Sequence, residues 1–261
     1  MIRSGSSGRS VAQPAYTSPG PGVPYALTAR VYDEIYSWKD YRAESGRIRR
    51  LIRENGPPRA KRLLDVACGT GSHLAYLSRW YDSTGLDLTE GMLRVARRKL
   101  PNVRFVRGRM EEFDLGAKYD AVTCLFSAIA YVRSERDLRR TIRNFANHLR
   151  PGGVAIVEPW LLLSGYRTGT VHVRTFGSDR LPIVRMSLSA RRGMRSIMDM
   201  HHLVGTPGGV RHWVEHHDLG MFPVRTYLQA FRAAGFRVRF LRNGLMKQRG
   251  LYVAVLRRSR P

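Results

Sequence analysis

Between Arg62 and Glu158 the sequence alternates short apolar runs with longer amphipathic stretches, and this rhythm restricts the fold more than any other feature of the chain. The apolar runs have the length of buried strands and lie at residues 62–67, 83–88, 103–106, 119–126 and 154–158. Stretches with helical spacing separate them, at residues 72–80, 90–100 and 135–149. Strands that alternate with helices form βαβ units, so we predict an α/β protein whose parallel sheet is covered on both faces.

Residues 161–219 break this rhythm. The region contains four stretches typical of antiparallel strands, at residues 171–174, 183–188, 196–204 and 210–216. The segment Gly205–Gly209 predicts the turn between the last two. A helix over 224–234 and strands over 236–241 and 251–256 then return to the core.

The N-terminal part of the chain has two sections. Residues 1–24 are rich in Ser, Gly and Pro, and we expect a flexible tail. From Ala26 to about Glu54 apolar residues recur at helical spacing, and Asn55–Pro58 ends that pattern. These boundaries divide the chain into segments 1–24, 25–56, 57–160, 161–219 and 220–261.

The chain carries 45 Lys and Arg against 20 Asp and Glu, a formal net charge of +25. Only five of the basic residues are lysines. A phosphate-rich partner would favour arginine, because the planar guanidinium binds phosphate oxygens bidentately. A genome rich in G and C also replaces Lys codons with Arg codons, and the arginine excess favours this as the larger part. Charge alone therefore leaves the function open.

No apolar run approaches the roughly 20 residues that a membrane-spanning helix needs. The N-terminus has no apolar stretch after Arg3 and Arg9, so a secretory signal is not predicted. Cys68 and Cys124 are the two cysteines, too few for a disulfide framework. We expect a cytoplasmic protein.

The strongest local motif is Leu64–Gly71, at the first strand–helix junction. Its glycines, Gly69 and Gly71, allow a tight turn and a close approach of the backbone to a ligand. Asp87 ends the second strand, where a carboxylate can bind both hydroxyls of a ribose. A third glycine and a Walker loop are absent, so the motif predicts a nucleoside-bearing cofactor without the usual pyrophosphate signature.

These residues carry a resemblance to the class I S-adenosylmethionine-dependent methyltransferases. Within that class the chain resembles the N,N-dimethyltransferases of nucleotide-linked amino sugars, of the desosamine and mycaminose type. The matching segments are Tyr32–Tyr36, Lys39–Tyr41, Leu64–Gly71, Phe126–Ser127, Val157–Trp160, Arg185–Ser187 and Arg249–Leu251. The resemblance implies a Rossmann-like cofactor-binding core (57–160), N-terminal lid helices (25–56), and an antiparallel insert (161–219) for acceptor binding or dimerisation. It also implies that residues 220–261 complete the core.

The resemblance implies S-adenosylmethionine as the cofactor. Tyr32 would cover it, Asp65 would line its methionine half, Asp87 its ribose and Met110 its adenine. The full set of implied cofactor-binding residues is Tyr32, Asp65, Ala67, Gly69, Gly71, Asp87, Met92, Met110, Leu125 and Phe126.

The resemblance also implies an acceptor pocket. The residues implied to line it are Tyr25, Ser127, Trp160, Tyr166, Arg185 and Arg249, the arginines facing a nucleotide diphosphate. Tyr131 lies where such relatives carry a residue near the transferred methyl, and it is the candidate catalytic residue that orients the nucleophile or assists proton loss. The alternative is that Tyr131 simply packs at a strand–helix junction.

The sequence departs from the family on the acceptor side. Arg109 precedes Met110 where the family has Asp, Leu161–Ser164 replaces an aromatic stretch, and Leu188 replaces a pocket histidine. The identity of the acceptor therefore stays open, as does the number of methyl groups added.

The histidines of the insert are interpreted without a metal-binding or catalytic role. His212-x-x-Glu215-His216 matches an inverted zinc-peptidase pattern, which requires a helix, whereas this segment reads as a strand. We therefore predict no metal site. His201, His202 and His217 are interpreted as polar residues of an exposed sheet.

The sequence thus predicts an enzyme of specialised (antibiotic) metabolism that N-methylates a small molecule, such as a thymidine-diphospho amino sugar. An RNA methyltransferase is the alternative that the charge favours, although no RNA-binding module is recognisable. A non-catalytic cofactor-binding protein is a third possibility, supported only by Arg109. We expect a homodimer, because an antiparallel insert leaves strand edges to be covered.

Overall fold

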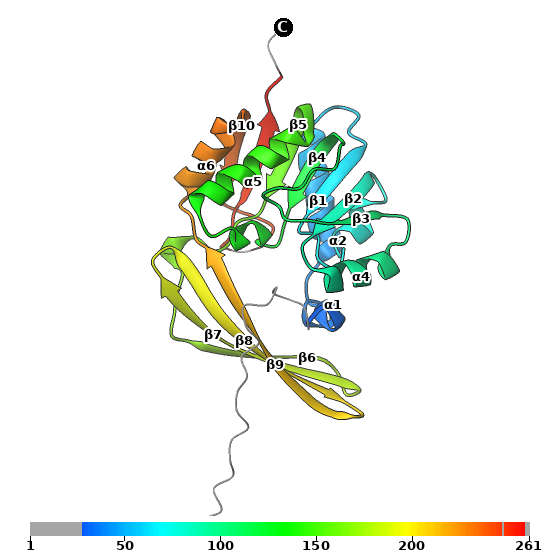
Figure 1. Cartoon of the computed structure of the whole chain (residues 1–261), viewed down its shortest axis with the longest axis vertical. Coiled ribbons are helices and arrows are strands. Elements are labelled where there is room, and N and C mark those ends of the chain that lie inside the picture. The colour runs from blue at the N-terminus through cyan, green and yellow to red at the C-terminus, as the bar shows by residue number, and fades with distance from the viewer. Residues whose placement is uncertain (1–27, 247, 259–261) are drawn as a thin grey trace, which may run out of the picture.

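The strands predicted between Arg62 and Val157 pair side by side in the computed structural model, which describes residues 28–246 and 248–258. The seven strands of this sheet are β1 (Arg62–Val66), β2 (Asp82–Asp87), β3 (Arg104–Arg107), β4 (Tyr119–Cys124), β5 (Leu149–Val157), β10 (Phe236–Leu241) and β11 (Leu251–Leu256). Their order is β10-β11-β5-β4-β1-β2-β3, and β1 to β5 are parallel (Figure 1). The chain leaves β1 in one direction and returns as β4 on its other side, so the carboxyl ends of β1 and β4 form the switch point where open α/β sheets bind ligands.

Both faces of this sheet are buried, as predicted. The helices of the described residues are α1 (Tyr32–Ile35), α2 (Tyr41–Asn55), α3 (Leu74–Leu77), α4 (Glu90–Lys99), α5 (Glu135–Asn147) and α6 (Val224–Ala233), with short 3₁₀ turns η1 (Thr28–Arg30), η2 (Ala128–Tyr131) and η3 (Leu163–Gly165). Leu64 and Val122 point to the cluster formed with α5 and α6. Leu63 and Ala121, one residue away, point to the cluster formed with α2 and α3. Because successive side chains are buried on opposite faces, these strands appear in the sequence as continuous apolar runs.

The insert forms a second, four-stranded sheet, entirely antiparallel. Its strands are β6 (Val171–Ser178), β7 (Leu181–Arg192), β8 (Arg195–Thr206) and β9 (Gly209–Gly220), in that order. The predicted strands are confirmed, and each one is longer than predicted. Figure 1 shows this sheet extending from one end of the seven-stranded sheet, with β9 leading back into α6.

Two predicted boundaries differ clearly from the structure. Residues 150–153, which the prediction left between the helix over 135–149 and the strand over 154–158, lie inside β5, where the pairing with β4 shifts register between Tyr119 and Ala121. Gly152 has φ +83°, so the glycines form an irregularity within the strand instead of a turn before it. The helix expected over 72–80 is the single turn α3, because i→i+3 hydrogen bonds tighten the chain after it.

The N-terminal helical pattern is divided between α1 and α2. Asp40 begins α2 by accepting a hydrogen bond from the backbone N–H of Ala43 at 2.8 Å. The predicted tail, residues 1–24, and Tyr25 lie outside the described residues. Within the described part of the chain, none of the helices combines the length and apolar character needed to cross a bilayer.

Candidate functional site

A pocket opens at the switch point, next to the carboxyl ends of β1 and β4. It is lined by Tyr32, Tyr41, Asp65, Ala67, Cys68, Gly69, Thr70, Ser72, His73, Leu125 and Phe126. Six of the ten predicted cofactor residues are therefore brought together: Tyr32, Asp65, Ala67, Gly69, Leu125 and Phe126.

The loop after β1 has three residues with positive φ, a backbone conformation that few residues other than glycine adopt easily. Ala67 has φ +57°, Gly69 +56° and Gly71 +76°. A Cβ on Gly69 would meet no atom within 4 Å, so open space lies directly above its backbone. Gly71 is closed in, since its Cβ would lie 3.2 Å from Leu100. Gly69 thus faces the pocket, while Gly71 packs the loop against α4 and β3.

Asp87 holds this loop in place. Its Oδ2 accepts a hydrogen bond from the backbone N–H of Gly69 at 2.9 Å, and its Oδ1 accepts one from that of Thr89 at 2.8 Å. Burial raises the pKa of Asp87 above its usual value, although both backbone donors act in the opposite direction. The carboxylate is therefore fixed in orientation at the end of β2.

Asp65 is the second buried carboxyl at this edge. It accepts a hydrogen bond from the Thr123 hydroxyl at 2.7 Å, across the β1–β4 boundary. Burial raises its pKa to about 7, and the nearby charge of Asp87 adds to the rise. An acid in this state readily ionises when a cation arrives.

The N-terminal segment closes over the same loop. Asp33 of α1 accepts a hydrogen bond from Thr70 Oγ1 at 2.6 Å and forms an ion pair with Lys99 of α4 at 2.6 Å. Tyr32 beside it is buried together with Met92. α1 is therefore attached to the β1 loop and to α4.

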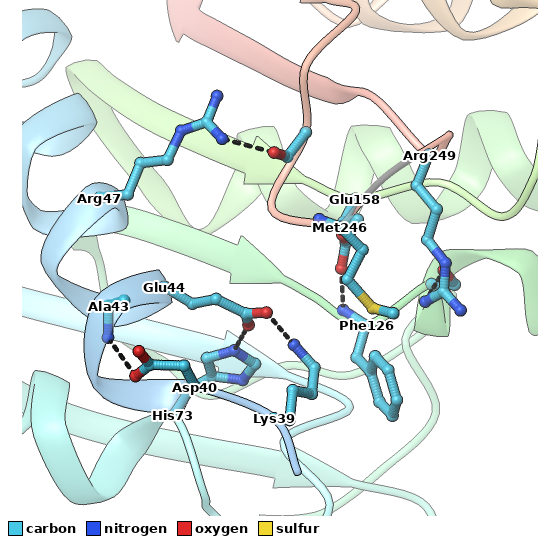
Figure 2. Close-up of polar contacts among 12 residues, drawn as sticks. Lys39, Asp40, Ala43, Glu44, Arg47, His73, Phe126, Glu158, Met246 and Arg249 are labelled. Atoms are coloured by element: carbon cyan, nitrogen blue, oxygen red, sulfur yellow. Dashed lines mark hydrogen bonds and ion pairs between the residues drawn. The ribbon is translucent and has the colours of Figure 1, made fainter.

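Three buried polar side chains, Lys39, Glu44 and His73, contact one another behind the pocket wall (Figure 2). Glu44 forms an ion pair with Lys39 and accepts a hydrogen bond from His73 Nε2 at 2.7 Å. Burial alone would raise the pKa of Glu44, but His73 and Lys39 outweigh it and lower that pKa. The Lys39 ammonium also lies 4.8 Å from the centre of the Phe126 ring.

The turn after β4 is strained and is held by Glu158. Phe126 and Ser127 have φ of +51° and +65°, the left-handed region that costs a non-glycine residue about 1–2 kcal/mol. Glu158 is fully buried, and its carboxylate accepts the backbone N–H of Phe126 at 2.7 Å and that of Met246 at 3.2 Å (Figure 2). The Ser127 hydroxyl donates to the Pro159 carbonyl at 2.8 Å. These bonds fix the Phe126 ring at the pocket and join the turn to the loop before β11.

Arg249 comes to this turn from the loop before β11. Its guanidinium donates to Ser127 Oγ at 2.9 Å and lies over the rings of Trp160, at 4.7 Å, and Phe126, at 5.3 Å. Three predicted acceptor residues, Ser127, Trp160 and Arg249, are therefore in direct contact.

Two other predicted acceptor residues lie on or against the insert. Arg185 of β7 donates to the Tyr36 hydroxyl at 3.1 Å, and the Tyr36 ring packs edge-on against Phe126 with centroids 5.0 Å apart. The Tyr166 hydroxyl lies 2.5 Å from Ser196 Oγ of β8. Tyr131, at the end of η2, is 2.8 Å from His217 Nδ1 of β9. The insert thus approaches the pocket on the side of Phe126 and Tyr131.

The remaining predicted residues lie away from the pocket lining. Met92 packs in the cluster with Tyr32, and Met110 packs against the core beneath α5. Arg109, which stands where the family has Asp, is exposed and pairs with Glu111 and Glu112.

Sequence reasoning missed several residues and misread two. Lys39 was noticed only as part of a matching segment, while Glu44 and His73 carried no local signal. The interpretation of His202 and His217 as residues of an exposed sheet is wrong: each is 1% exposed, because that face of the insert turns toward the core. β9 is a strand, so His212 and His216 lie on the face opposite Glu215, and the metal pattern does not assemble.

Known proteins resemble this chain along most of its length. Residues 63–153 match the family model described as a methyltransferase domain. The chain is 41% identical over 231 residues to dTDP-3-amino-3,4,6-trideoxy-α-D-glucopyranose N,N-dimethyltransferase of Streptomyces venezuelae, covering 87% of this chain and 97% of the relative. It is 36% identical over 241 residues to dTDP-3-amino-3,6-dideoxy-α-D-glucopyranose N,N-dimethyltransferase of Streptomyces fradiae, covering 90% and 94%.

Solved structures of sugar N-methyltransferases are also similar to this chain. The crystal structure of DesVI from Streptomyces venezuelae has a TM-score of 0.82 at 39% identity and covers 90% of this chain and 99% of its own. The sugar N-methyltransferase KedS8 from a Streptoalloteichus species has a TM-score of 0.85 at 35% identity, covering 96% and 100%. CalS10 from Micromonospora echinaspora, an amino pentose methyltransferase solved with S-adenosylmethionine bound, has a TM-score of 0.77 at 34% identity, covering 90% and 98%.

The raised pKa of Asp65 predicts a pH-dependent stability. Without ligand, the unfolded chain binds fewer protons than the folded chain between about pH 4 and pH 7, so this carboxyl lowers the free energy of unfolding as pH rises through that window. Asp65→Asn removes this ionisable group. The free energy of unfolding of the variant minus that of the wild type should therefore be about 2–3 kcal/mol more positive at pH 8 than at pH 5. Urea unfolding of both proteins at the two pH values measures it.

Asp82→Asn is the matched control, because the Asp82 side chain is 78% exposed at the start of β2. It should change the free energy of unfolding little at either pH. An equal gain for Asp65→Asn at pH 5 and pH 8 would contradict the prediction.

Proposed function

The chain belongs to the S-adenosylmethionine-dependent methyltransferases, in the family of the dTDP-aminosugar N,N-dimethyltransferases, and we propose on that premise that its acceptor is the amino group of a dTDP-linked deoxyamino sugar. The observation that carries this proposal is the extent of the likeness. The similarity covers 87% of the chain at 41% identity, more than the core segment 57–160 can account for, so it includes the insert. The alternative of an RNA substrate rests on net charge alone.

The residues of the switch point fit the cofactor. The open space above Gly69 admits a ligand against the backbone, and two buried carboxyls with raised pKa values flank it, which suits a molecule with cationic centres. We assign the ribose to Asp87 and the methionine half to Asp65, Ala67 and Gly69. Bound there, S-adenosylmethionine supplies a methyl carbon already activated by a positively charged sulfur.

The other predicted residues would enclose the cofactor. Tyr32 covers it from the N-terminal segment, and Leu125 and Phe126 lie beside the reacting centre. Met92 supports Tyr32 from beneath, since both belong to one buried cluster. We assign the adenine side to Met110, and Gly71 keeps the β1 loop close to α4.

The protein's contribution to methyl transfer is positioning. A neutral amine attacks the methyl carbon in line, so the chain must orient the amine, exclude water and leave its lone pair free. Tyr131, whose hydroxyl lies 2.8 Å from His217 Nδ1, is our candidate for orienting the amine or assisting its loss of a proton.

We assign the nucleotide part of the acceptor to the cluster of Ser127, Trp160 and Arg249, together with Arg185 and Tyr166. The Arg249 guanidinium is stacked on Trp160 and directed by Ser127, a preorganised arrangement that suits a diphosphate. Arg185 lies on the insert side of Phe126, through Tyr36, so the two arginines reach the same region from different segments.

The insert has a second face, for which we propose a second copy of the chain. Four large apolar side chains that neighbour one another on β6 and β7 are between 42% and 55% exposed: Val171, Val173, Met186 and Leu188. Contiguous exposed apolar groups of this kind mark interaction surfaces. β6 is also an edge strand with free backbone groups.

The proposed function is tested by mass spectrometry of the products formed with S-adenosylmethionine. The acceptors are dTDP-3-amino, dTDP-4-amino and non-amino deoxysugars, with bulk tRNA as a further sample. One or two methyl increments on a dTDP-amino sugar alone are expected. Methylation of tRNA with none on any dTDP-amino sugar would overturn the proposal.

Arg249→Ala is expected to raise the KM for the dTDP-amino sugar about tenfold to a hundredfold, because it removes charge-assisted hydrogen bonds to phosphate. The dissociation constant of S-adenosylhomocysteine should stay unchanged, and Arg249→Lys should recover part of the loss. Arg237→Ala, at an exposed position of β10, is the matched control. An unchanged KM for Arg249→Ala would rule out the phosphate assignment.

The proposed dimer predicts that charge on the outer face of the insert separates the subunits. Val173→Lys combined with Met186→Lys places two ammonium groups at opposing positions of β6 and β7. Sedimentation velocity at micromolar concentration should show a dimer for the wild type and a monomer for the double variant. A monomeric wild type would refute the proposal.

A further inference from the structure

The inner face of the insert buries three titratable side chains that the proposed reaction has not yet used. His202 of β8 and His217 of β9 are each 1% exposed, and Glu215 of β9 is 7% exposed. Strand alternation places them on one face, since Glu215 and His217 are two residues apart and His202 pairs with Trp213 of the same row. A polar group buried in this way is normally hydrogen-bonded.

Glu215 departs from this rule at both oxygens. Among the described residues neither of its carboxylate oxygens has a hydrogen-bond partner, although both are buried, and the buried Nδ1 of His202 lacks one as well. The basic side chain that approaches it is His217, whose Nε2 lies 3.7 Å from Glu215 Oε2, too far for a hydrogen bond. The chain carries 45 Lys and Arg, yet within the described residues none of them forms an ion pair with this carboxylate. Leaving a buried carboxylate without donors is costly, so the position demands a partner.

The groups around Glu215 are engaged elsewhere. Arg185 donates to the Tyr36 hydroxyl at 3.1 Å, and Thr28 accepts a hydrogen bond from Trp213 Nε1 at 3.1 Å. His202 stacks on Trp213 with centroids 5.3 Å apart, and burial lowers its pKa to about 4, so it is neutral. Burial raises the pKa of Glu215, but His217 and Thr28 outweigh it and lower that pKa, so this position is anionic.

This position adjoins the pocket from the acceptor side. His217 connects Glu215 to Tyr131, which follows the Phe126–Ser127 turn along the chain. On its other side Glu215 is close to Tyr36: burial raises the pKa of that phenol, and the charge of Glu215 adds to the rise. Tyr36 in turn packs against Phe126. Glu215 thus lies between two side chains that both border the reacting centre assigned above.

The unpaired carboxylate calls for a ligand with N–H donors or positive charge. A metal ion is not indicated, because residues 28–246 and 248–258 contain no group of three His, Cys, Asp or Glu side chains placed to hold one. The acceptor of an N-methyltransferase carries a suitable group, since an aliphatic amine arrives as an ammonium at neutral pH.

We infer that Glu215 receives the amino group of the acceptor, an inference that rests on the proposed function. The carboxylate pairs with the ammonium of the arriving sugar, which then loses a proton to water and keeps an N–H hydrogen bond to Glu215. The lone pair of nitrogen forms the new C–N bond as the C–S bond breaks with its electron pair remaining on sulfur, so the positive charge passes from sulfur to nitrogen. Glu215 stabilises that charge as it develops, and the same group selects an amine over a hydroxyl.

The test compares two probes on the wild type and on Glu215→Gln. The first probe is whichever dTDP-amino sugar of the panel the wild type methylates, and the second is the same sugar with a hydroxyl in place of the amine. Binding of each is measured by calorimetry with S-adenosylhomocysteine present, and kcat/KM is measured for the amine. Glu54→Gln, an exposed position at the end of α2, is the matched control.

For Glu215→Gln we expect affinity for the amine probe and kcat/KM to fall by about tenfold or more, since a charged hydrogen bond is lost. Affinity for the hydroxyl probe and for S-adenosylhomocysteine should change by less than about twofold on the same scale. The unfolding temperature should stay level or rise, because the variant removes an uncompensated buried charge. Glu215→Asp should keep part of the preference for the amine.

Three results would overturn the inference. One is an unchanged affinity and kcat/KM for the amine, and another is an equal loss for both probes. The third is a lower unfolding temperature together with weaker S-adenosylhomocysteine binding, which indicates a structural role. In each of these the wild type still methylates the amino sugar, so the proposed function stands, whereas a wild type that methylates none of the panel removes the proposed function and this inference together.

Discussion

A single buried carboxylate, that of Glu158, holds together the two segments that border the pocket on the side of Phe126. It accepts the backbone N–H groups of Phe126 and Met246, and so joins the end of β4 to the loop before β11. The left-handed turn at Phe126 and Ser127 persists because this pairing compensates its strain. The Phe126 ring, the Ser127 hydroxyl and, through it, the Arg249 guanidinium all take their positions from that turn.

The site is acidic inside a strongly basic protein. The carboxyls of Asp65, Asp87 and Glu158 all have pKa values raised by burial, and Glu215 adds an unpaired carboxylate on the insert. Methyl transfer from a sulfonium to an amine moves a positive charge across this region without creating a new one. Buried carboxylates around the path suit such a reaction, because in a low dielectric they act strongly on a nearby cation. Burying these carboxyls lowers the stability of the chain without ligand.

Much of the fold could be predicted from local pattern. The strands, their parallel order in the core and the antiparallel insert follow from apolar runs whose period and length leave little choice. The closeness of Asp65 and Asp87 was predictable for the same reason, since carboxyl ends of parallel strands meet at one edge. Residues 150–153 lie outside the predicted strand but inside β5, because the β4–β5 pairing that includes them involves a partner far away in the sequence.

The sequence by itself therefore determined the doubly covered sheet, the edge where the pocket lies and the family, all of which depend on periodicity and on short motifs. Only the tertiary structure decided which face of the insert is buried, and therefore that His202, Glu215 and His217 are buried. In an antiparallel strand the two faces alternate, and the side that loses water is chosen by what packs against it. The contact of Tyr131 with His217 spans 86 positions of the chain, and no local pattern carries such information.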